Sequence, residues 1–122
     1  MALLREYKEI AYQWGIWKTE ESPEELLALL PDPERYEQQL TLFSSPHRKL
    51  EWLSVRVLLY QLLGEEKTIE YAPSGKPHLA DSSYFISISH TRGYVAVILS
   101  PVSEVEIDIE QYGQRVHKVA HK

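Results

Sequence analysis

The longest regular segment of the chain carries helix signals at both ends. Ser45 and Pro46 open it in the order that suits an N-cap followed by the first helical position, and Gly64 closes it at a C-terminal cap position. Between these ends, apolar side chains recur every three or four residues, at Leu50, Leu53, Val57, Leu58 and Leu62. The sequence therefore predicts a long helix with one buried stripe.

Two shorter helices and a strand are predicted before this helix. We expect a strand over residues 10–17. Ser22, Pro23 and Glu25 form a capping box, which predicts a helix running to Leu30. Asp32 and Pro33 repeat the device and predict a second helix, to about residue 42.

Strands dominate the rest of the chain. Residues 68–72 are β-prone and residues 73–77 read as a turn, while residues 84–89 and 94–99 predict a hairpin. A further strand is expected over residues 105–110, and a helix is expected to start at residue 114. Helices thus precede a meander of strands, which indicates an α+β class with helices packed on an antiparallel sheet.

Composition limits the kinds of protein this can be. The chain has 122 residues, a hydrophobic fraction of 43%, a charged fraction of 25% and no cysteine, so disulfides and thiol chemistry are excluded. No apolar run approaches the roughly 20 residues that span a bilayer, and no export signal is visible, so we expect a cytoplasmic protein without membrane contact. A net charge of −5 disfavours a general nucleic-acid binder. An anionic small ligand requires a local basic cluster.

Residues 105–110 alternate apolar and acidic side chains. Val105, Ile107 and Ile109 fall on one face of the predicted strand, and the opposite face carries Glu104, Glu106, Asp108 and Glu110. Asp108 and Glu110 point the same way, and two such carboxylates can hold a hard cation such as Mg²⁺. The alternative is an amphipathic strand with a solvated acidic face.

Three other places carry groups suited to an anion. His90 ends an apolar strand between Ser89 and Thr91, a cluster of donors that can hold a phosphate. Lys76 lies in the turn Ser74-Gly75-Lys76-Pro77, and the long helix carries Arg48, Lys49 and Arg56. Each has a structural alternative: a structural histidine, a plain turn, and a solvated helix face. The histidines at 47, 78, 117 and 121 show no metal-ligand spacing.

The order of these motifs resembles the 4′-phosphopantetheinyl transferase superfamily, in its larger, surfactin-synthetase-activator type. The resemblance covers about residues 45–112. It rests on the basic helix at His47-Arg48, on Gly75-Lys76-Pro77 as the G-K-P element, on Ile88-Ser89-His90-Thr91 as the I-S-H-S element, and on Ile107-Asp108-Ile109-Glu110 as the G-x-D-x-E element. The small trimeric type of the superfamily fits badly, because its D-x-E lies near the N-terminus.

The resemblance implies a holo-carrier-protein synthase activity. Such enzymes transfer the 4′-phosphopantetheine arm of coenzyme A to a serine of an acyl or peptidyl carrier protein and use Mg²⁺. It implies a catalytic site of Asp108, Glu110 and His90, in which Asp108 and Glu110 bind the metal. Arg48, Lys76, Ser89 and His90 would then bind coenzyme A, the last two near its 3′-phosphate.

The sequence departs from the family in two respects. Glu106 stands where the G-x-D-x-E element has glycine. The family's second half, with its further metal-binding glutamate, has no counterpart in residues 1–122. We therefore expect residues 1–122 to form the N-terminal half of the pseudo-dimeric transferase fold, inactive alone and prone to self-association through an uncovered apolar face.

Two further hypotheses stay open. The chain could be a non-catalytic module that binds coenzyme A or a nucleotide, or assembles with a partner. It could instead bind a cation at its acidic strand with no role for coenzyme A.

Overall fold

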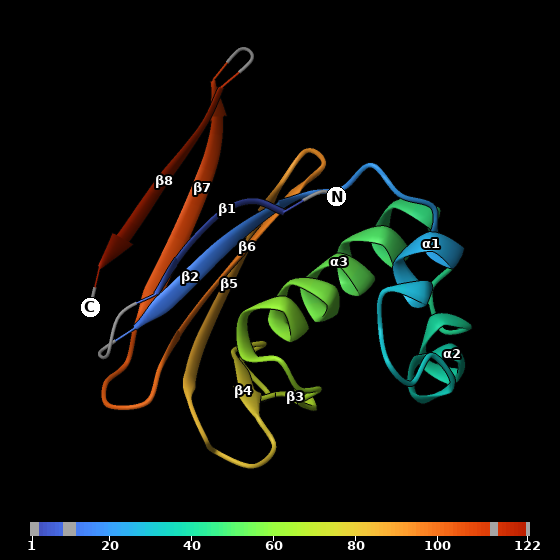
Figure 1. The fold of residues 1–122 in the computed structure, drawn as a ribbon, viewed down its shortest axis with the longest axis horizontal. Coiled ribbons are helices and arrows are strands. Elements are labelled where there is room, and N and C mark those ends of the chain that lie inside the picture. The colour runs from blue at the N-terminus through green and yellow to red at the C-terminus, as the bar shows by residue number, and fades with distance from the viewer. Residues whose placement is uncertain (1–2, 9–11, 113–114, 122) are drawn as a thin grey trace.

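The computed structural model describes residues 3–8, 12–112 and 115–121. Over this part of the chain, three helices and eight strands form an α+β fold with antiparallel sheets (Figure 1). The predicted class is therefore confirmed at that level. No helix of the described residues is long and apolar enough to cross a membrane.

The main sheet has four antiparallel strands in the order β1 (Leu3–Lys8), β2 (Gln13–Lys18), β6 (Tyr94–Ser100) and β5 (Phe85–Thr91). The predicted hairpin is confirmed as β5–β6, so β5 forms one edge of this sheet. The strand expected over residues 10–17 is β2, displaced toward the C-terminus. Strand β1 was not predicted, because apolar and polar residues mix there without a clear period.

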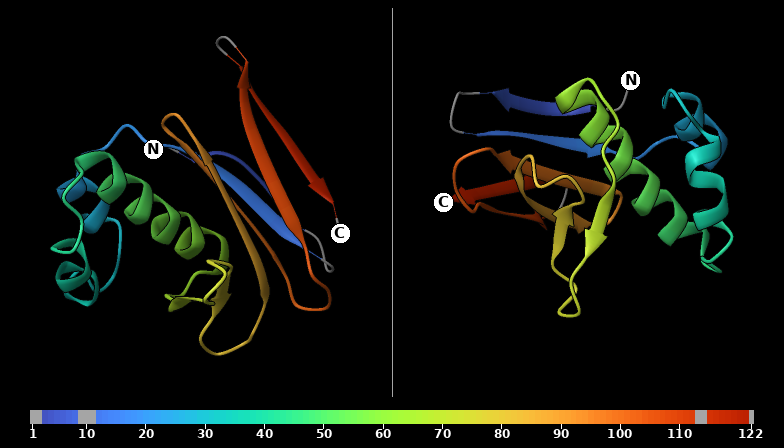
Figure 2. Two further views of the ribbon diagram at one scale, coloured as in Figure 1. Left: turned by 180° about the vertical axis from the view of Figure 1, so that it is seen from behind. Right: turned by 90° about the horizontal axis from the view of Figure 1, so that it is seen from below.

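The long helix α3 spans Pro46–Leu63 and confirms both predicted caps. The Arg48 backbone N–H donates to Ser45 Oγ at 3.4 Å, and Gly64 adopts the left-handed conformation with φ 75°. The helix lies between the sheet and the shorter helices, as Figures 1 and 2 show. Its buried surface is therefore broader than the predicted stripe: every residue from 53 to 59 is buried, whereas Leu50 is half-buried.

The two short helices are α1 (Pro23–Ala28) and α2 (Glu34–Leu40). The capping box of α1 is confirmed, with the Ser22 N–H donating to Glu25 Oε1 at 2.8 Å. Both helices end two residues before the expected position. At α2 the N-cap is Pro33, which has no side-chain capping bond, so Asp32 does not repeat the device.

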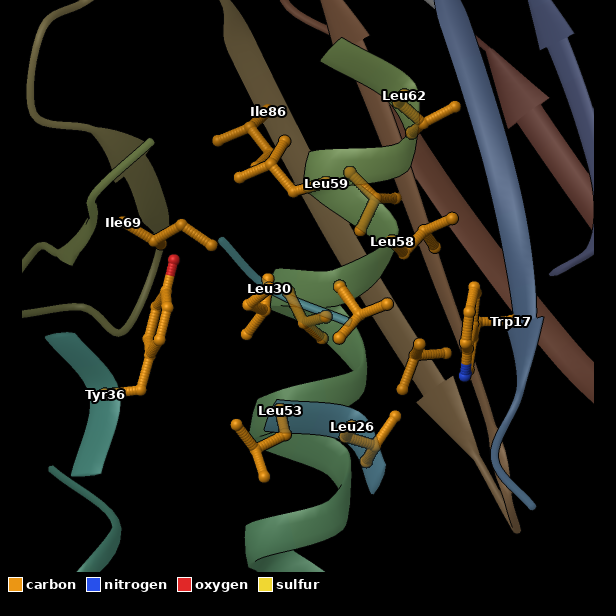
Figure 3. Close-up of a cluster of buried hydrophobic side chains, with 14 of the residues drawn as sticks. Trp17, Leu26, Leu30, Tyr36, Leu53, Leu58, Leu59, Leu62, Ile69 and Ile86 are labelled. Atoms are coloured by element: carbon orange, nitrogen blue, oxygen red, sulfur yellow. The ribbon is translucent and has the colours of Figure 1, made fainter. Parts of the chain in front are cut away.

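Strand β6 buries both of its faces. Val95, Val97 and Leu99 join the core that α3 shares with Trp17 (Figure 3). The alternate residues Ala96 and Ile98 join a second core on the opposite face, with Trp14, Ile16, Ile107 and Ile109. The sheet is thus a middle layer between α3 and strand β7.

Two small ribbons complete the fold. Strands β3 (Ile69–Tyr71) and β4 (Pro77–Leu79) flank the predicted turn, although β4 itself was not predicted. Strand β7 (Glu106–Tyr112) confirms the acidic strand. The helix expected from residue 114 is wrong, because β8 (Arg115–His121) pairs along the whole length of β7. That ladder supplies backbone partners that a local sequence signal cannot reveal.

Candidate functional site

A hollow of about 420 Å³ lies between α3, the turn before β4, and β5. We call it the α3–β5 hollow. Three predicted elements that are far apart in the sequence meet there: Arg48 from α3, Gly75 and Pro77 from the turn, and His90 from β5. The other lining residues are Phe43, Glu51, Trp52, Val55, Arg56, Tyr71 and Ile88.

Arg56 is the most deeply buried charge in this hollow, at 6% exposure. Its guanidinium carbon lies 3.9 Å from the centre of the Trp52 ring. Arg56 donates to the Trp52 carbonyl at 3.3 Å and to the Tyr71 hydroxyl at 3.4 Å. Burial lowers the pKa of Arg56, and no carboxylate in the described part of the chain is paired with it. A buried cation without a counter-ion favours a bound anion.

His90 is anchored by Glu51 of α3. Its Nδ1 lies 3.1 Å from Glu51 Oε2, and the same oxygen lies 3.1 Å from His47 Nε2. An ionised carboxylate only accepts hydrogen bonds, so each imidazole presents an N–H to it. His90 Nε2 is therefore the ring nitrogen left to meet a ligand.

Lys76 points away from the α3–β5 hollow. Its Nζ lies 3.5 Å from Glu104 Oε1, and both side chains are exposed. Gly75 has a φ of 92°, which favours glycine at the tip of this turn. Lys76 lines a neighbouring hollow of about 570 Å³, the edge hollow, together with Pro77, Ile86, Ser87, Ile88, Glu104, Val105 and Glu106.

The edge hollow wraps around the free edge of the main sheet. Ile86 and Ile88 belong to the face of β5 that carries His90, whereas Ser87 belongs to the other face. Pro77 and Ile88 also line the α3–β5 hollow, so the two hollows share a wall.

Ser89 contacts β7 and does not line the α3–β5 hollow. Its hydroxyl donates to Asp108 Oδ1 at 3.2 Å and accepts the Ile109 backbone N–H at 3.2 Å. Ser87 accepts the Ile107 N–H at 3.3 Å in the same manner. The two serines therefore hold β7 parallel to β5 through side-chain hydroxyls.

The predicted site residues thus fall on two faces of one strand. His90 faces α3, whereas Asp108 lies on the β7 side, against the neighbouring Ser89. A ligand in the α3–β5 hollow would have to cross the edge of β5 to reach Asp108. Glu110 belongs to β7 by its backbone, opposite His117, but its side chain lies outside the described part of the structure.

The acidic strand fits a magnesium ion only in part. Asp108 is exposed on β7, and Mg²⁺ commonly uses one or two carboxylates together with substrate phosphates. Within residues 3–8, 12–112 and 115–121, however, no group of three or more His, Asp or Glu side chains is placed to hold a metal ion.

No role was predicted for Glu51, Trp52 or Tyr71, and Arg56 was predicted only as part of a basic helix face. A signal for two of them exists, since Arg48, Trp52 and Arg56 recur every four residues and so share one face of α3. For Glu51, its spacing of four residues from His47 is a local signal, whereas its contact with His90 on β5 has none.

No protein-family model and no curated protein matches this chain. The functional inference therefore depends on the geometry of the site and on the motifs that converge there.

Proposed function

We propose that this chain carries the coenzyme A-binding part of a 4′-phosphopantetheinyl transferase. One observation carries the proposal: Arg48, Gly75 with Pro77, and His90, which come from three motifs of the family, line one hollow. An unrelated chain that matched these short motifs by chance would have no reason to bring them together.

The charge of the α3–β5 hollow supports an anionic ligand. Arg48, Arg56 and His90 line it against a single carboxylate, Glu51, in a chain whose net charge is −5. A local basic site in an acidic protein attracts anions selectively. The planar guanidinium of Arg56 suits a phosphate group, to which it can donate two parallel hydrogen bonds.

The aromatic wall of the same hollow supports a nucleotide over a simple phosphate. Phe43, Trp52 and Tyr71 line it, and the Phe43 and Trp52 rings lie 5.9 Å apart between centroids. Aromatic rings provide flat apolar surface on which a base can stack.

The edge hollow gives the remainder of coenzyme A a path toward Asp108. It shares Pro77 and Ile88 with the α3–β5 hollow and reaches Glu106 at the start of β7. A nucleotide bound beside His90 would extend its diphosphate and pantetheine arm along the edge of β5. Ser89 fixes Asp108 beside that path.

In the proposed reaction, the carrier's serine oxygen bonds to the phosphorus that bears the pantetheine arm. The bond from that phosphorus to the bridging oxygen breaks, and 3′,5′-ADP leaves as the serine proton is lost. A Mg²⁺ ion held by Asp108 and Glu110 would supply neutralisation of phosphate charge. Arg48, Arg56 and His90 bind and orient the nucleotide end.

Calorimetry on the 122-residue chain tests the binding step, with coenzyme A and dephospho-coenzyme A compared in the presence of MgCl₂. Loss of the 3′-phosphate removes charge-assisted contacts worth about 1.5–3 kcal/mol, so dephospho-coenzyme A should bind about tenfold or more weakly. His90→Ala should reduce the difference in affinity between coenzyme A and dephospho-coenzyme A. The control His78→Ala, on an exposed histidine paired with Glu70, should leave this difference unchanged. Absence of coenzyme A binding would reject the proposal.

A second candidate is a coenzyme A-binding module without turnover. It is favoured by a contrast between two places. The α3–β5 hollow has basic and aromatic side chains suited to a nucleotide, whereas no group of three or more His, Asp or Glu side chains in the described residues is placed to hold a metal ion. Incubating the protein with apo carrier protein, coenzyme A and Mg²⁺ separates the two. A mass gain of one phosphopantetheine arm supports the transferase, and binding without mass gain supports the module. A metal affinity that depends neither on coenzyme A nor on His90→Ala would instead indicate a simple cation binder.

A further inference from the structure

A separate hollow of about 200 Å³ lies on the other side of Arg56, between α2, α3 and β3. We call it the α2–α3 hollow. It shares the Trp52, Arg56 and Tyr71 side chains with the α3–β5 hollow, and its remaining wall includes Arg35, Tyr36 and Lys67. Figure 3 shows Tyr36 on α2 across from Ile69 of β3, at the edge of the main core. Arg56 belongs to the basic helix singled out from the sequence, but none of the motifs that carry the family resemblance falls in this place.

Three cations and no carboxylate line this hollow among the described residues. Lys67 is already neutralised, since its Nζ lies 2.7 Å from Asp81 Oδ2 and 3.7 Å from Glu65 Oε1. Arg35 donates to Thr68 Oγ1 at 2.5 Å, and its guanidinium carbon lies 6.0 Å from the centre of the Tyr36 ring.

The charges of both arginines act on Tyr36 and lower its pKa. Burial and Glu66 raise that pKa by more, so the net shift is upward. The carboxylate of Glu66 accepts the hydroxyl hydrogen of Tyr36. Neither Arg35 nor Arg56 has a carboxylate partner in the part of the chain that the structure describes. Two guanidinium groups from different helices, facing one small hollow without a counter-ion, form a site of the kind that binds phosphate.

We propose that the α2–α3 hollow binds a tetrahedral oxyanion, namely inorganic phosphate or a terminal phosphate group, between Arg35 and Arg56. The hollow has room for several water molecules, each of which occupies about 30 Å³ in the liquid, and so accommodates a phosphate with its hydration. The hydroxyls of Thr68 and Tyr71 add neutral partners at its rim.

The shared Arg56 couples this site to the α3–β5 hollow. An anion on either side of the guanidinium reduces the positive potential that the other side offers. Phosphate should therefore weaken the binding of a nucleotide in the α3–β5 hollow, and the nucleotide should weaken the binding of phosphate by the same factor.

Calorimetric titration of the 122-residue chain with inorganic phosphate tests the site, with chloride at matched ionic strength as the reference. Arg35→Gln changes an exposed residue that lines only the α2–α3 hollow, and Arg48→Gln changes an exposed residue that lines only the α3–β5 hollow. Arg35→Gln should weaken phosphate binding about tenfold, as expected for one lost charge-assisted pair, while Arg48→Gln leaves it within about twofold. Equal losses in the two variants, or no binding beyond the chloride reference, would overturn the proposal.

A second titration uses 3′,5′-ADP and distinguishes a free phosphate from a nucleotide phosphate as the occupant. If the site binds free phosphate, Arg35→Gln should leave the affinity for 3′,5′-ADP unchanged. It should also remove the competition between 3′,5′-ADP and inorganic phosphate. If a nucleotide phosphate occupies it, Arg35→Gln should weaken 3′,5′-ADP as well. An unchanged competition in Arg35→Gln would place both anions in the α3–β5 hollow and reject the second site. The phosphate titration does not depend on coenzyme A binding, so it can succeed or fail independently of the proposed function.

Discussion

The hydroxyl of Ser89 donates a hydrogen bond to Asp108 Oδ1 at 3.2 Å and accepts the N–H of the next residue on β7, also at 3.2 Å. This single side chain fixes the acidic strand against the edge of the main sheet. It also stands directly before His90, which faces the opposite side. The two proposed parts of the site are thus joined through adjacent residues of β5.

Ser89→Ala should therefore loosen Asp108 as well as β7. We expect the free energy of unfolding to fall by about 1 kcal/mol, the usual value for one hydrogen bond, and the Mg²⁺-dependent part of coenzyme A binding to fall with it. Denaturant unfolding and calorimetry with and without EDTA measure the two effects. Ser87→Ala is the matched control, because Ser87 holds Ile107 in the same way. A similar loss of the Mg²⁺-dependent part in both variants would show that Ser89 has no special relation to Asp108.

Arg56→Met should separate stability from binding. The variant replaces a buried, unpaired cation by an apolar side chain of similar length, so the free energy of unfolding should change by less than about 1 kcal/mol or rise. Coenzyme A affinity should fall at least about tenfold, because one charge-assisted phosphate contact is lost. Thermal unfolding and calorimetry measure the pair of effects, and Arg92→Met, at an exposed turn residue, serves as control. Unchanged affinity would exclude Arg56 from the ligand site.

Glu51 should act on coenzyme A through His90. Because Glu51 Oε2 holds His90 Nδ1 at 3.1 Å, Glu51→Ala should weaken coenzyme A binding in the wild-type background and have little further effect once His90→Ala is present. A double-mutant cycle on coenzyme A affinity should give a coupling of about 0.5 kcal/mol or more. Glu51→Gln should restore part of the loss, since its amide oxygen still accepts from Nδ1. Strictly additive losses would indicate that Glu51 does not position the imidazole.

The Lys67–Asp81 pair should make stability fall in acid. The hydrogen bond from Lys67, followed by those from the Ser83 side chain and backbone, holds the pKa of Asp81 below its usual range. Because folding lowers the pKa of this carboxylate, its ionised form stabilises the folded protein at pH values above the unfolded-state pKa of about 3.9. This stabilisation is lost as the pH falls through the folded-state pKa. Asp81→Asn should be less stable than wild type at pH 7, and the difference should shrink below about pH 4.

Denaturant unfolding from pH 7 to pH 2 checks this expectation. Asp32→Asn provides a control at an exposed aspartate beside α2. A constant difference between Asp81→Asn and wild type across that range would contradict the assigned role of the pair.

The features predicted correctly are those with a local physical cause. The Ser45 and Gly64 caps of α3 and the Ser22 capping box of α1 involve residues only three or four positions apart, so their signals stand in the sequence itself. The hairpin β5–β6 likewise has a short loop between two apolar runs. Elements stabilised by distant pairing were missed or wrong: β1 depends on β2, and β8 depends on β7.

The site shows the same division. Arg48, the turn residues and His90 could be selected as candidates, but their convergence on one hollow depends on how α3 packs against β5. The spacing of Arg48, Trp52 and Arg56 places them on one face of α3, but the importance of Arg56 comes from its burial, which that spacing does not reveal. The placement of Lys76 toward Glu104, and of Ser89 toward β7, depends on contacts made after the strands assemble.

The two-sided burial of β6 has a consequence for the register of the whole sheet. Since Ala96 and Val97 both meet apolar surroundings, the pattern of β6 by itself does not oppose a slip of one residue between β5 and β6. The alternation of β5 does oppose it, because Ile86 packs in the core with α3 whereas Ser87 and Ser89 bond to β7, and the tight connection at Gly93, with a φ of 80°, fits the same alignment. A slip there would exchange the directions of Ser89 and His90, turning the imidazole toward β7 and the hydroxyl toward α3. The alternation of β5 and the turn at Gly93 together thus set which face of the molecule carries each chemical group.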